Sequence, residues 1–244
     1  MKAPAIRLEG RAKIGGADIF GPLKFDAPAG EWTCLLGSSG VGKSTLLRLL
    51  AGLNSGITFD GKITCNDGTV MVPRTTLMLQ TDMLLPWLCV LQNVMSGARL
   101  RGEKSDATRA TALLESVGLQ GFAGRFPHTL SGGQRQRVAL ARTLMEDRPV
   151  VLLDEPFSAL DAKNRALMQE LAVRLLSGRT VVIVTHDPYE AARLGTRIFV
   201  MNRKGLVDMS PPAMPAIRPF DAPEVLKLAG QLLEVLHQEV DVTS

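Results

Sequence analysis

The most constraining feature of this chain is the stretch from Gly37 to Thr45, which follows the pattern G-x-x-x-x-G-K-S. The apolar run 32–36 precedes it, and leucines at helical spacing follow it. Glycines let the backbone curl so that successive N–H groups point at an anion, and the start of a helix adds positive charge. This context predicts a nucleoside triphosphate site, in which Lys43 reaches the β- and γ-phosphates and Ser44 ligates Mg²⁺. The predicted nucleotide-binding residues of this loop are Gly37, Ser38, Ser39, Gly40, Val41, Gly42, Lys43, Ser44 and Thr45.

The composition is that of an ordinary globular protein of 244 residues, of which 45% are hydrophobic. This length suffices for one large domain or for one domain with an added lobe. No run of about eighteen apolar residues occurs and the N-terminus lacks the apolar core of a secretory signal, so we expect neither a membrane span nor a leader. Cys34, Cys65 and Cys89 lack the spacing of zinc ligands, which favours reduced thiols. The net charge of +4 is most simply an ordinary surface bias.

Two stretches in the first third of the chain are typical of antiparallel strands. Apolar residues alternate loosely over residues 1–30, which predicts short strands. The segment 57–72 carries the turn signals Asp60-Gly61 and Asp67-Gly68, which predict hairpins. Together these stretches predict a β lobe, and a further short strand is expected at 76–79.

The rest of the chain alternates between helical patterns and buried strands. Residues 88–145 are predicted to be mainly helical, with one helix capped by Ser105 or Asp106 and another beginning at Gly132 and Gly133. Continuous apolar runs at 150–153 and 180–184 predict strands buried on both faces of a parallel sheet. The expected fold class is therefore α/β.

A second motif narrows the class of nucleotide-binding protein. The stretch from Leu130 to Arg137 reads L-S-G-G-Q-R-Q-R and resembles the signature sequence of ABC-type ATPases. By itself the Ser-Gly-Gly pattern is only a helix start, with free N–H groups ready for an anion. The resemblance implies that this helix end contacts ATP held by a second subunit. The residues implied in that contact are Ser131, Gly132, Gly133 and Gln134.

The remaining motifs occur in the order expected for the same family. The stretch ending in Asp154-Glu155 resembles a Walker B strand, so that Asp154 would hold Mg²⁺ and Glu155 would polarise the attacking water. Gln80 resembles the Q-loop glutamine that senses Mg²⁺ and this water, and His186 resembles the switch histidine on the γ-phosphate. Asp161 belongs to a loop similar to one that crosses the subunit interface, and a simple helix cap is its alternative role. The implied catalytic residues are Glu155, His186 and Gln80, and the implied metal ligands are Ser44, Gln80 and Asp154.

The resemblance covers most of the chain and implies its organisation. We expect a P-loop NTPase core with a mostly parallel sheet, an antiparallel β lobe and an inserted helical lobe. Within a single ABC ATPase domain at 1–244, residues 1–87 and 146–210 would form the nucleotide-binding core, 88–145 the helical lobe and 211–244 a C-terminal helical tail. Two such subunits would face each other head to tail with ATP between them, so an isolated subunit should hydrolyse ATP poorly.

The segment 80–87 narrows the branch of the family. It resembles the stretch after the Q-loop in importers of nitrate, sulfonate, taurine and thiamine precursors. This implies an ATP-hydrolysing subunit at the cytoplasmic face of the membrane. A periplasmic solute-binding protein would be an indirect partner. The first hypothesis for the substrate is a thiamine pyrimidine precursor. Permease docking is expected near Leu84, Leu85, Pro86 and Trp87. The alternative interpretation of these four residues is an internal hydrophobic loop. A soluble ABC ATPase acting on DNA or ribosomes and an exporter subunit are the alternatives, but no basic stripe with aromatic residues indicates nucleic acid.

One position departs from the family pattern. The family usually has an aromatic residue about two dozen positions before the P-loop, on which adenine stacks, and an ungapped alignment places Ile14 there. Phe20 is the nearest aromatic residue upstream of the loop, and its pattern indicates a buried strand position. The preference for ATP over GTP is therefore open.

Overall fold

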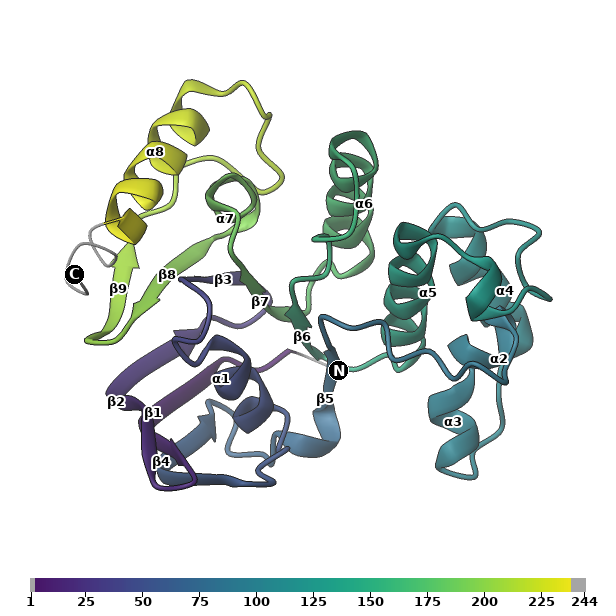
Figure 1. The fold of residues 1–244 in the computed structure, drawn as a ribbon, viewed down its shortest axis with the longest axis horizontal. Coiled ribbons are helices and arrows are strands. Elements are labelled where there is room, and N and C mark those ends of the chain that lie inside the picture. Colours follow the sequence, from purple (N-terminus) through teal and green to yellow (C-terminus); the bar gives the residue numbers. More distant parts are fainter. Residues whose placement is uncertain (1–2, 238–244) are drawn as a thin grey trace. The chain divides into compact units, whose positions relative to one another are not determined.

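The computed structural model describes residues 3–237, which form two compact units. The first unit takes the chain up to Thr75, the segment Pro149–Asp154 and the chain from Gly178 onward. The second takes Thr76–Arg148 and Glu155–Ser177. The chain thus crosses between the units several times, as the colours of Figure 1 allow the reader to follow.

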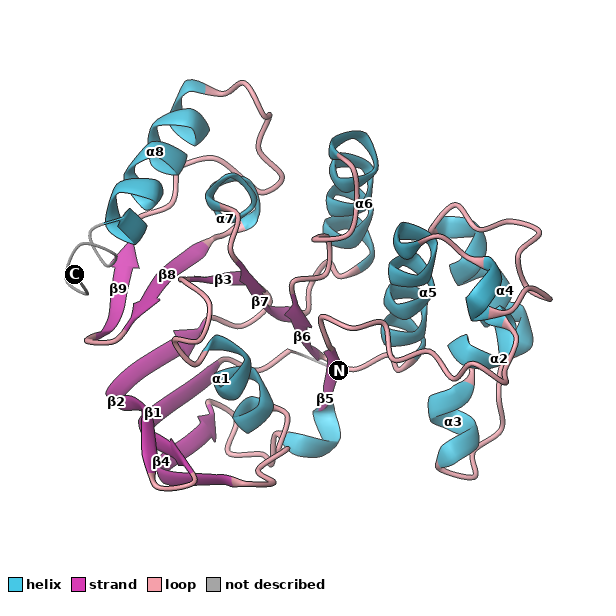
Figure 2. Ribbon diagram, in the orientation of Figure 1, coloured by secondary structure: helices cyan, strands magenta, loops and turns pink. Residues whose placement is uncertain are grey.

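The first unit contains a mainly parallel sheet of β-strands in the order β6-β7-β3-β8-β9 (Figure 2). The strands β3, β6, β7 and β8 run parallel, and β9 pairs antiparallel with β8. Every residue of β3, β6 and β7 is buried, as expected for strands covered on both faces. The bounds are β3 Trp32–Leu36, β6 Val150–Asp154, β7 Thr180–Thr185, β8 Arg197–Asn202 and β9 Gly205–Met209.

A second sheet of the first unit is the β lobe, with the strand order β2-β1-β4 and antiparallel pairing throughout. Its strands are β1 (Ile6–Ile14), β2 (Ala17–Ala27) and β4 (Ile57–Cys65). The prediction of antiparallel strands within residues 1–30 is therefore confirmed.

The predicted hairpin turn at Asp60-Gly61 is wrong, because β4 runs straight through both residues. Gly61 lies opposite Gly10 of β1, and a Cβ atom on Gly61 would fall 2.1 Å from the carbonyl oxygen of Glu9. Glycine is needed here for close approach of two strands, not for a turn. The signal at Asp67-Gly68 does mark a turn, but the chain continues into the 3₁₀ helix η1 (Val72–Arg74) instead of a returning strand.

Among the described residues, three α-helices belong to the first unit. The helix α1 (Lys43–Leu50) follows the P-loop and contacts β6 and β7 through its leucine face. The helices α7 (Pro188–Leu194) and α8 (Pro223–His237) pack against each other, as Figure 1 shows. The predicted C-terminal tail includes α8, and its last residues, 238–244, lie outside the described residues, as do Met1 and Lys2.

The strand β5 (Thr75–Met78) leads into the second unit, which is helical. The helix α5 packs against both α2 and α4. Asp106, one of the two predicted cap residues, caps α4 by accepting a hydrogen bond from the main-chain N–H of Arg109 at 2.9 Å. The helical elements are α2 Val90–Val94, α3 Ser96–Leu100, α4 Ala107–Ser116, η2 Pro127–Thr129, α5 Gly132–Met145 and α6 Ala162–Leu175.

Candidate nucleotide-binding and hydrolysis site

Parallel pairing in the first unit brings three predicted site segments to one edge of its sheet. Asp154 of β6 is paired with Val184 of β7, and Leu36 of β3 is paired with Thr185. The P-loop, Asp154 and His186 therefore all leave the sheet at the carboxyl ends of adjacent strands. This edge is where ligands bind in open α/β sheets.

The P-loop ends in a helix whose first turn lacks a side-chain cap. Gly42 is the N-cap residue of α1, with a φ of 105° in the left-handed region. A Cβ atom there would lie 2.9 Å from a side-chain atom of Ile19 and 3.1 Å from one of Phe20. Both the backbone conformation and the close packing on β2 therefore require glycine. Because Gly42 provides no capping side chain, the first N–H groups of α1 suit an anion.

Lys43 is held against the loop that it is predicted to serve. Its Nζ donates to the carbonyl oxygens of Gly37 and Ser38, both at 2.7 Å, and its side chain is buried. The ammonium group is thus preoriented at the mouth of the loop, where a phosphate would replace or join these carbonyl partners.

The oxygen ligands in the first unit suit Mg²⁺ bound together with phosphates. Ser44 is exposed in the first turn of α1, and Asp154 is 5% exposed at the end of β6. Within residues 3–237 no group of three or more His, Cys, Asp or Glu side chains suits a metal ion by itself. One hydroxyl and one carboxylate do fit Mg²⁺, because this ion usually keeps water and substrate phosphates as its other ligands.

His186 follows the last residue of β7 and is exposed. The next residue, Asp187, caps α7 by accepting a hydrogen bond from the main-chain N–H of Tyr189 at 2.9 Å. The N–H of Asp187 in turn donates to the hydroxyl of Thr185 at 3.0 Å. These bonds fix the main chain on both sides of His186. The end of β7 and the start of α7 therefore determine the position of this residue.

In the second unit, two of the predicted catalytic side chains meet. The Nε2 of Gln80 donates to Oε2 of Glu155 at 3.0 Å. Glu155 has a φ of 47°, an uncommon left-handed conformation for this residue type. The hydroxyl and the main-chain N–H of Ser158 both donate to its carbonyl oxygen, at 3.0 and 3.3 Å. Because the amide nitrogen of Gln80 serves Glu155, its carbonyl oxygen is the atom suited to Mg²⁺.

The signature segment forms a fully capped helix start. Ser131 is the N-cap of α5, and its hydroxyl oxygen accepts from the main-chain N–H of Gln134 at 3.2 Å. The side-chain oxygen of Gln134 accepts from the N–H of Ser131 at 2.9 Å, which completes a capping box. The Ser131 hydroxyl acts here as an acceptor, so its hydrogen is the group suited to a phosphate oxygen. Gly132 and Gly133 form the first turn of this helix.

Asp161 is a helix cap in the second unit. Its carboxylate accepts from the main-chain N–H of Asn164 at 3.0 Å at the start of α6. This main-chain hydrogen bond, followed by one from the Asn164 side chain, lowers the pKa of Asp161. The local alternative of a simple cap therefore describes the single chain, and a role across a subunit interface stays a prediction.

The predicted docking segment is only partly exposed. Leu84 is buried and Leu85 half-buried, whereas Pro86 is exposed and Trp87 is 70% exposed. The buried side chain of Asn93 holds the loop by donating to the carbonyl oxygens of Leu85 and Leu88 at 3.1 and 2.9 Å. The expectation of a four-residue apolar patch is thus wrong for Leu84, because this side chain packs inward.

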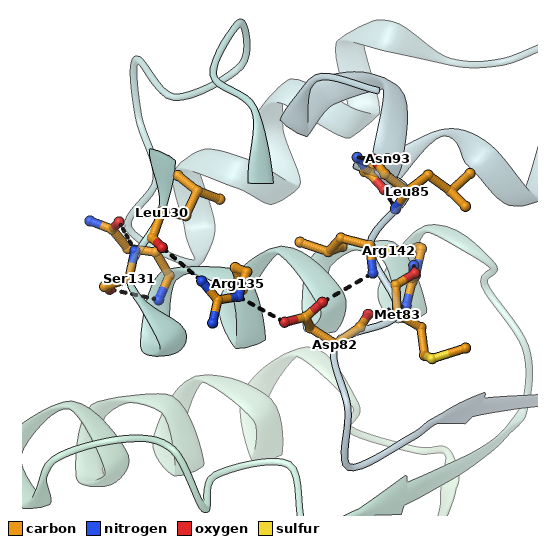
Figure 3. Close-up of polar contacts among 10 residues, drawn as sticks. Asp82, Met83, Leu85, Asn93, Leu130, Ser131, Arg135 and Arg142 are labelled. Atoms are coloured by element: carbon orange, nitrogen blue, oxygen red, sulfur yellow. Dashed lines mark hydrogen bonds and ion pairs between the residues drawn. The ribbon is translucent and has the colours of Figure 1, made fainter. Parts of the chain in front are cut away.

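Sequence reasoning missed three side chains that organise this region, shown in Figure 3. Asp82 forms an ion pair with Arg135 of α5, with 2.9 Å between Oδ2 and Nε. Arg142, two helical turns further on, donates to the carbonyl oxygens of Asp82 and Met83, both at 2.7 Å. No local sequence pattern predicts these contacts, because the partners are more than fifty positions apart.

Ile14, at the expected adenine position, ends β1 at the tip of the β1–β2 hairpin. Its side chain is 37% exposed, and the neighbouring Lys13 pairs with Asp18 at 3.2 Å. Phe20 is 4% exposed, as predicted for a buried strand residue.

Comparison with known proteins agrees with this geometry. Residues 20–158 match the family described as ABC transporter. An uncharacterized ABC transporter ATP-binding protein of Haemophilus influenzae is 48% identical over 190 residues, which cover 77% of this chain and 78% of that protein. The aliphatic sulfonates import ATP-binding protein SsuB 1 of Paracoccus denitrificans is 39% identical over 243 residues, covering 98% and 96%.

Solved structures of similar fold include bacterial ABC transporter cassettes. The dimeric structure of MJ0796 has a TM-score of 0.73 and 27% identity, and covers 86% of this chain and 100% of that one. A post-hydrolysis dimer of the same cassette with ADP and phosphate has a TM-score of 0.74 and 28% identity, with the same shares covered. The predicted α/β fold, with its mostly parallel sheet and antiparallel β lobe, is confirmed.

Proposed function

This chain is an ATP-binding subunit of the ABC transporter family, an ATPase coupled to transport, and we propose that it powers a membrane importer for a small solute. Several relatives are named as aliphatic sulfonate import proteins, and they support a sulfonate as the solute. They favour it over the thiamine pyrimidine precursor, which was the first hypothesis from the sequence. The same relatives weigh against an exporter and against a soluble ATPase acting on DNA or ribosomes.

The observation that carries the hydrolytic role is the hydrogen bond between Gln80 and Glu155. It holds a carboxylate directly after the Walker B strand, and this carboxylate would orient a water molecule for in-line attack on the γ-phosphate. Lys43 and His186 would stabilise the charge that develops on the transferred phosphoryl group. Mg²⁺, held by Ser44 and Asp154 with the carbonyl oxygen of Gln80, would neutralise the β- and γ-phosphate oxygens.

Each complete site would need a second copy of the chain. The capped start of α5, with Ser131 and the following glycines, offers donors to an anion but has no lysine of its own. A head-to-tail dimer would place this helix start over the ATP bound to the P-loop of the partner. Asp161 would lie near the same interface, where its cap on α6 fixes the loop that precedes this helix.

We place the dimer at the cytoplasmic face of the membrane, docked on permease subunits that receive solute from a periplasmic binding protein. No helix within residues 3–237 is long and apolar enough to cross a membrane. The docking surface would include Trp87 and Pro86, with Met83, whose side chain is 59% exposed, beside them in the loop. Asn93 and Arg142 donate hydrogen bonds to main-chain carbonyl groups of this loop, and these bonds would fix the position of Trp87.

Trp87→Ala tests the docking surface. An aromatic anchor at an interface is worth about 2 kcal/mol or more, so permease association and transport should weaken while folding and ATP affinity persist. Leu100→Ala is the matched control, because Leu100 is 80% exposed on α3 outside the docking loop. Equal permease pull-down by the Trp87 variant and the wild type would place docking elsewhere.

Growth on a solute tests the transport function as a whole. A strain lacking this chain should lose growth with an aliphatic sulfonate as its only sulfur source but keep growth on sulfate. The wild-type gene should restore growth, whereas Glu155→Gln should not. Normal growth of the deletion strain on sulfonates would exclude this solute class, and co-purification with nucleic acid instead of a permease would favour the soluble alternative.

A further inference from the structure

We propose that the ion pair between Asp82 and Arg135 is a positioning device that couples the two ATP sites of the dimer through each subunit. The proposal rests on the proposed function, since it requires Glu155 and Ser131 of one chain to serve different ATP molecules. It concerns contacts within the second unit only, and Figure 3 shows the residues that form its central part.

Arg135 connects Asp82 to the main chain beside the signature serine. Its Nε donates to Oδ2 of Asp82 at 2.9 Å, and its Nη1 donates to the carbonyl oxygen of Leu130 at 2.8 Å. Leu130 directly precedes Ser131, the N-cap of α5. The guanidinium fork therefore ties the approach to the signature helix to a carboxylate outside that helix. Displacing Asp82 would displace the carbonyl of Leu130 and, with it, the Ser131 hydroxyl.

Asp82 is itself held firmly on α5. Both the carbonyl oxygen of Asp82 and that of Met83 accept from Arg142 at 2.7 Å, and the N–H of Leu84 donates to Oδ1 of Asp82 at 3.1 Å. Met83 has a φ of 47°, an unfavourable conformation that these contacts maintain. Burial lowers the pKa of Arg142, which indicates that this guanidinium is partly withdrawn from water. The helix α5 thus holds the loop through two side chains on one face, Arg135 and Arg142.

The other end of the connection is the catalytic carboxylate. Asp82 lies two positions after Gln80, whose side chain donates to Glu155 at 3.0 Å. A continuous path of hydrogen bonds and short main-chain links therefore joins Glu155 to Ser131. In a head-to-tail dimer, Glu155 acts on the ATP of its own P-loop and Ser131 on the ATP of the partner. A change at one ATP would be passed along this path to the other.

The solvent exposure of the Asp82–Arg135 ion pair indicates a role in positioning and not in folding stability. The side chains of Arg135 and Asp82 are 37% and 29% exposed. Ion pairs as accessible as this contribute little to folding stability, because water screens them. A large loss of cooperative hydrolysis in a variant of normal stability would therefore reflect misplacement of Ser131.

The experiment compares ATP hydrolysis by the full-length wild type and Asp82→Asn over a range of ATP concentrations. We expect turnover to fall about tenfold and the Hill coefficient to fall from near 2 toward 1, since the upper limit is the number of coupled sites. ATP binding to the isolated subunit should be unchanged, because the P-loop is untouched. Asp82→Glu restores the charge and should recover most of the turnover.

Glu103→Gln is the matched control. It breaks the ion pair of Arg101 with Glu103, at 2.9 Å in the same unit, which reaches neither Gln80 nor Ser131. This variant should behave like the wild type. The proposal is overturned if wild-type hydrolysis is not cooperative, if Asp82→Asn keeps wild-type turnover and cooperativity, or if the control loses as much. A wild-type protein that binds no ATP would instead overturn the proposed function.

Discussion

The starts of α1 and α5 are both glycine-containing helix N-termini that suit phosphate, but they are built in opposite ways. At α1, the N-cap Gly42 contributes no side chain, and Lys43 folds over the loop onto its carbonyl oxygens. At α5, Ser131 and Gln134 close a complete capping box, and a cation, Arg135, bonds to Asp82 and to the carbonyl oxygen of Leu130.

The difference indicates how the work is divided between the two helix ends. The start of α1 brings its own positive charge and is predicted to bind a nucleotide without help. The capping box of α5 satisfies the N–H groups of Ser131 and Gln134, which leaves the serine hydroxyl and the remaining main-chain donors. We therefore expect this helix start to add to a site that another chain has begun. Its exact placement then matters more than its intrinsic affinity.

The largest expected effect comes from removing Glu155, the proposed catalytic carboxylate. Glu155→Gln keeps the shape of the side chain but cannot orient water as a base, so turnover should fall about 1000-fold. ATP should still bind, and the nucleotide-sandwiched dimer should accumulate. Steady-state hydrolysis and sedimentation in the presence of ATP measure the two effects. Near wild-type turnover would show that Glu155 is not the catalytic base.

Lys43→Ala tests whether α1 is self-sufficient. Loss of a charged hydrogen-bond donor to phosphate costs up to about 3 kcal/mol, which corresponds to a loss in ATP affinity of roughly 100-fold. Calorimetric titration of ATP into the isolated subunit measures it. Lys24→Ala, which removes an exposed lysine of the β lobe, is the control and should bind normally. Unchanged affinity in the Lys43 variant would contradict the predicted role of the P-loop.

Ser131→Ala and Ser131→Gly separate the two roles of the signature serine. Alanine at an N-cap costs about 1 kcal/mol of stability and glycine only a few tenths, but both remove the hydroxyl. If the hydroxyl contacts the partner's ATP, both variants should lose turnover about tenfold while monomer affinity for ATP stays normal. A loss confined to the alanine variant would mean that Ser131 acts only as a cap.

Ile14→Tyr tests whether contacts with the nucleotide base add to the affinity that the P-loop provides for the phosphates. If residue 14 faces adenine, a stacked ring should tighten ATP binding by about 0.5–1.5 kcal/mol. GTP should gain similarly, because both bases present a π face. Titration of both nucleotides against both proteins decides the matter, and no change for either would mean that this position does not contact the base.

The smallest expected effect concerns the start of α6, which Asp161 caps. The pKa of Asp161 lies below its ordinary value of 3.8, so the cap contributes stability above that pH and loses it as the pH falls through the lowered pKa. Amide exchange in the first turn of α6 should therefore accelerate below about pH 4. Asp161→Asn keeps a capping oxygen and should abolish this pH dependence, and the same acceleration in that variant would assign it to another group.

Local patterns predicted the elements whose formation depends on residues a few positions apart. The buried runs of β6 and β7 formed strands, and Asp106 and the Ser131 segment began helices as expected. The same local reasoning failed at Gly61, because a glycine needed for contact with a neighbouring strand looks like one needed for a turn. It also failed at Leu84, which is buried in a loop whose neighbouring carbonyl groups accept from Arg142 of α5 and Asn93 of α2, later in the chain.

The sequence by itself predicted the phosphate-binding loop and determined the order of the motifs and the family, because each motif is a short contiguous stretch whose chemistry is independent of distant residues. Only the tertiary structure decided that Gln80 meets Glu155 and that Asp82 meets Arg135, across 75 and 53 positions. The reason is physical: a hydrogen bond between distant positions depends on how the chain folds back, and no periodicity in the sequence encodes that distance.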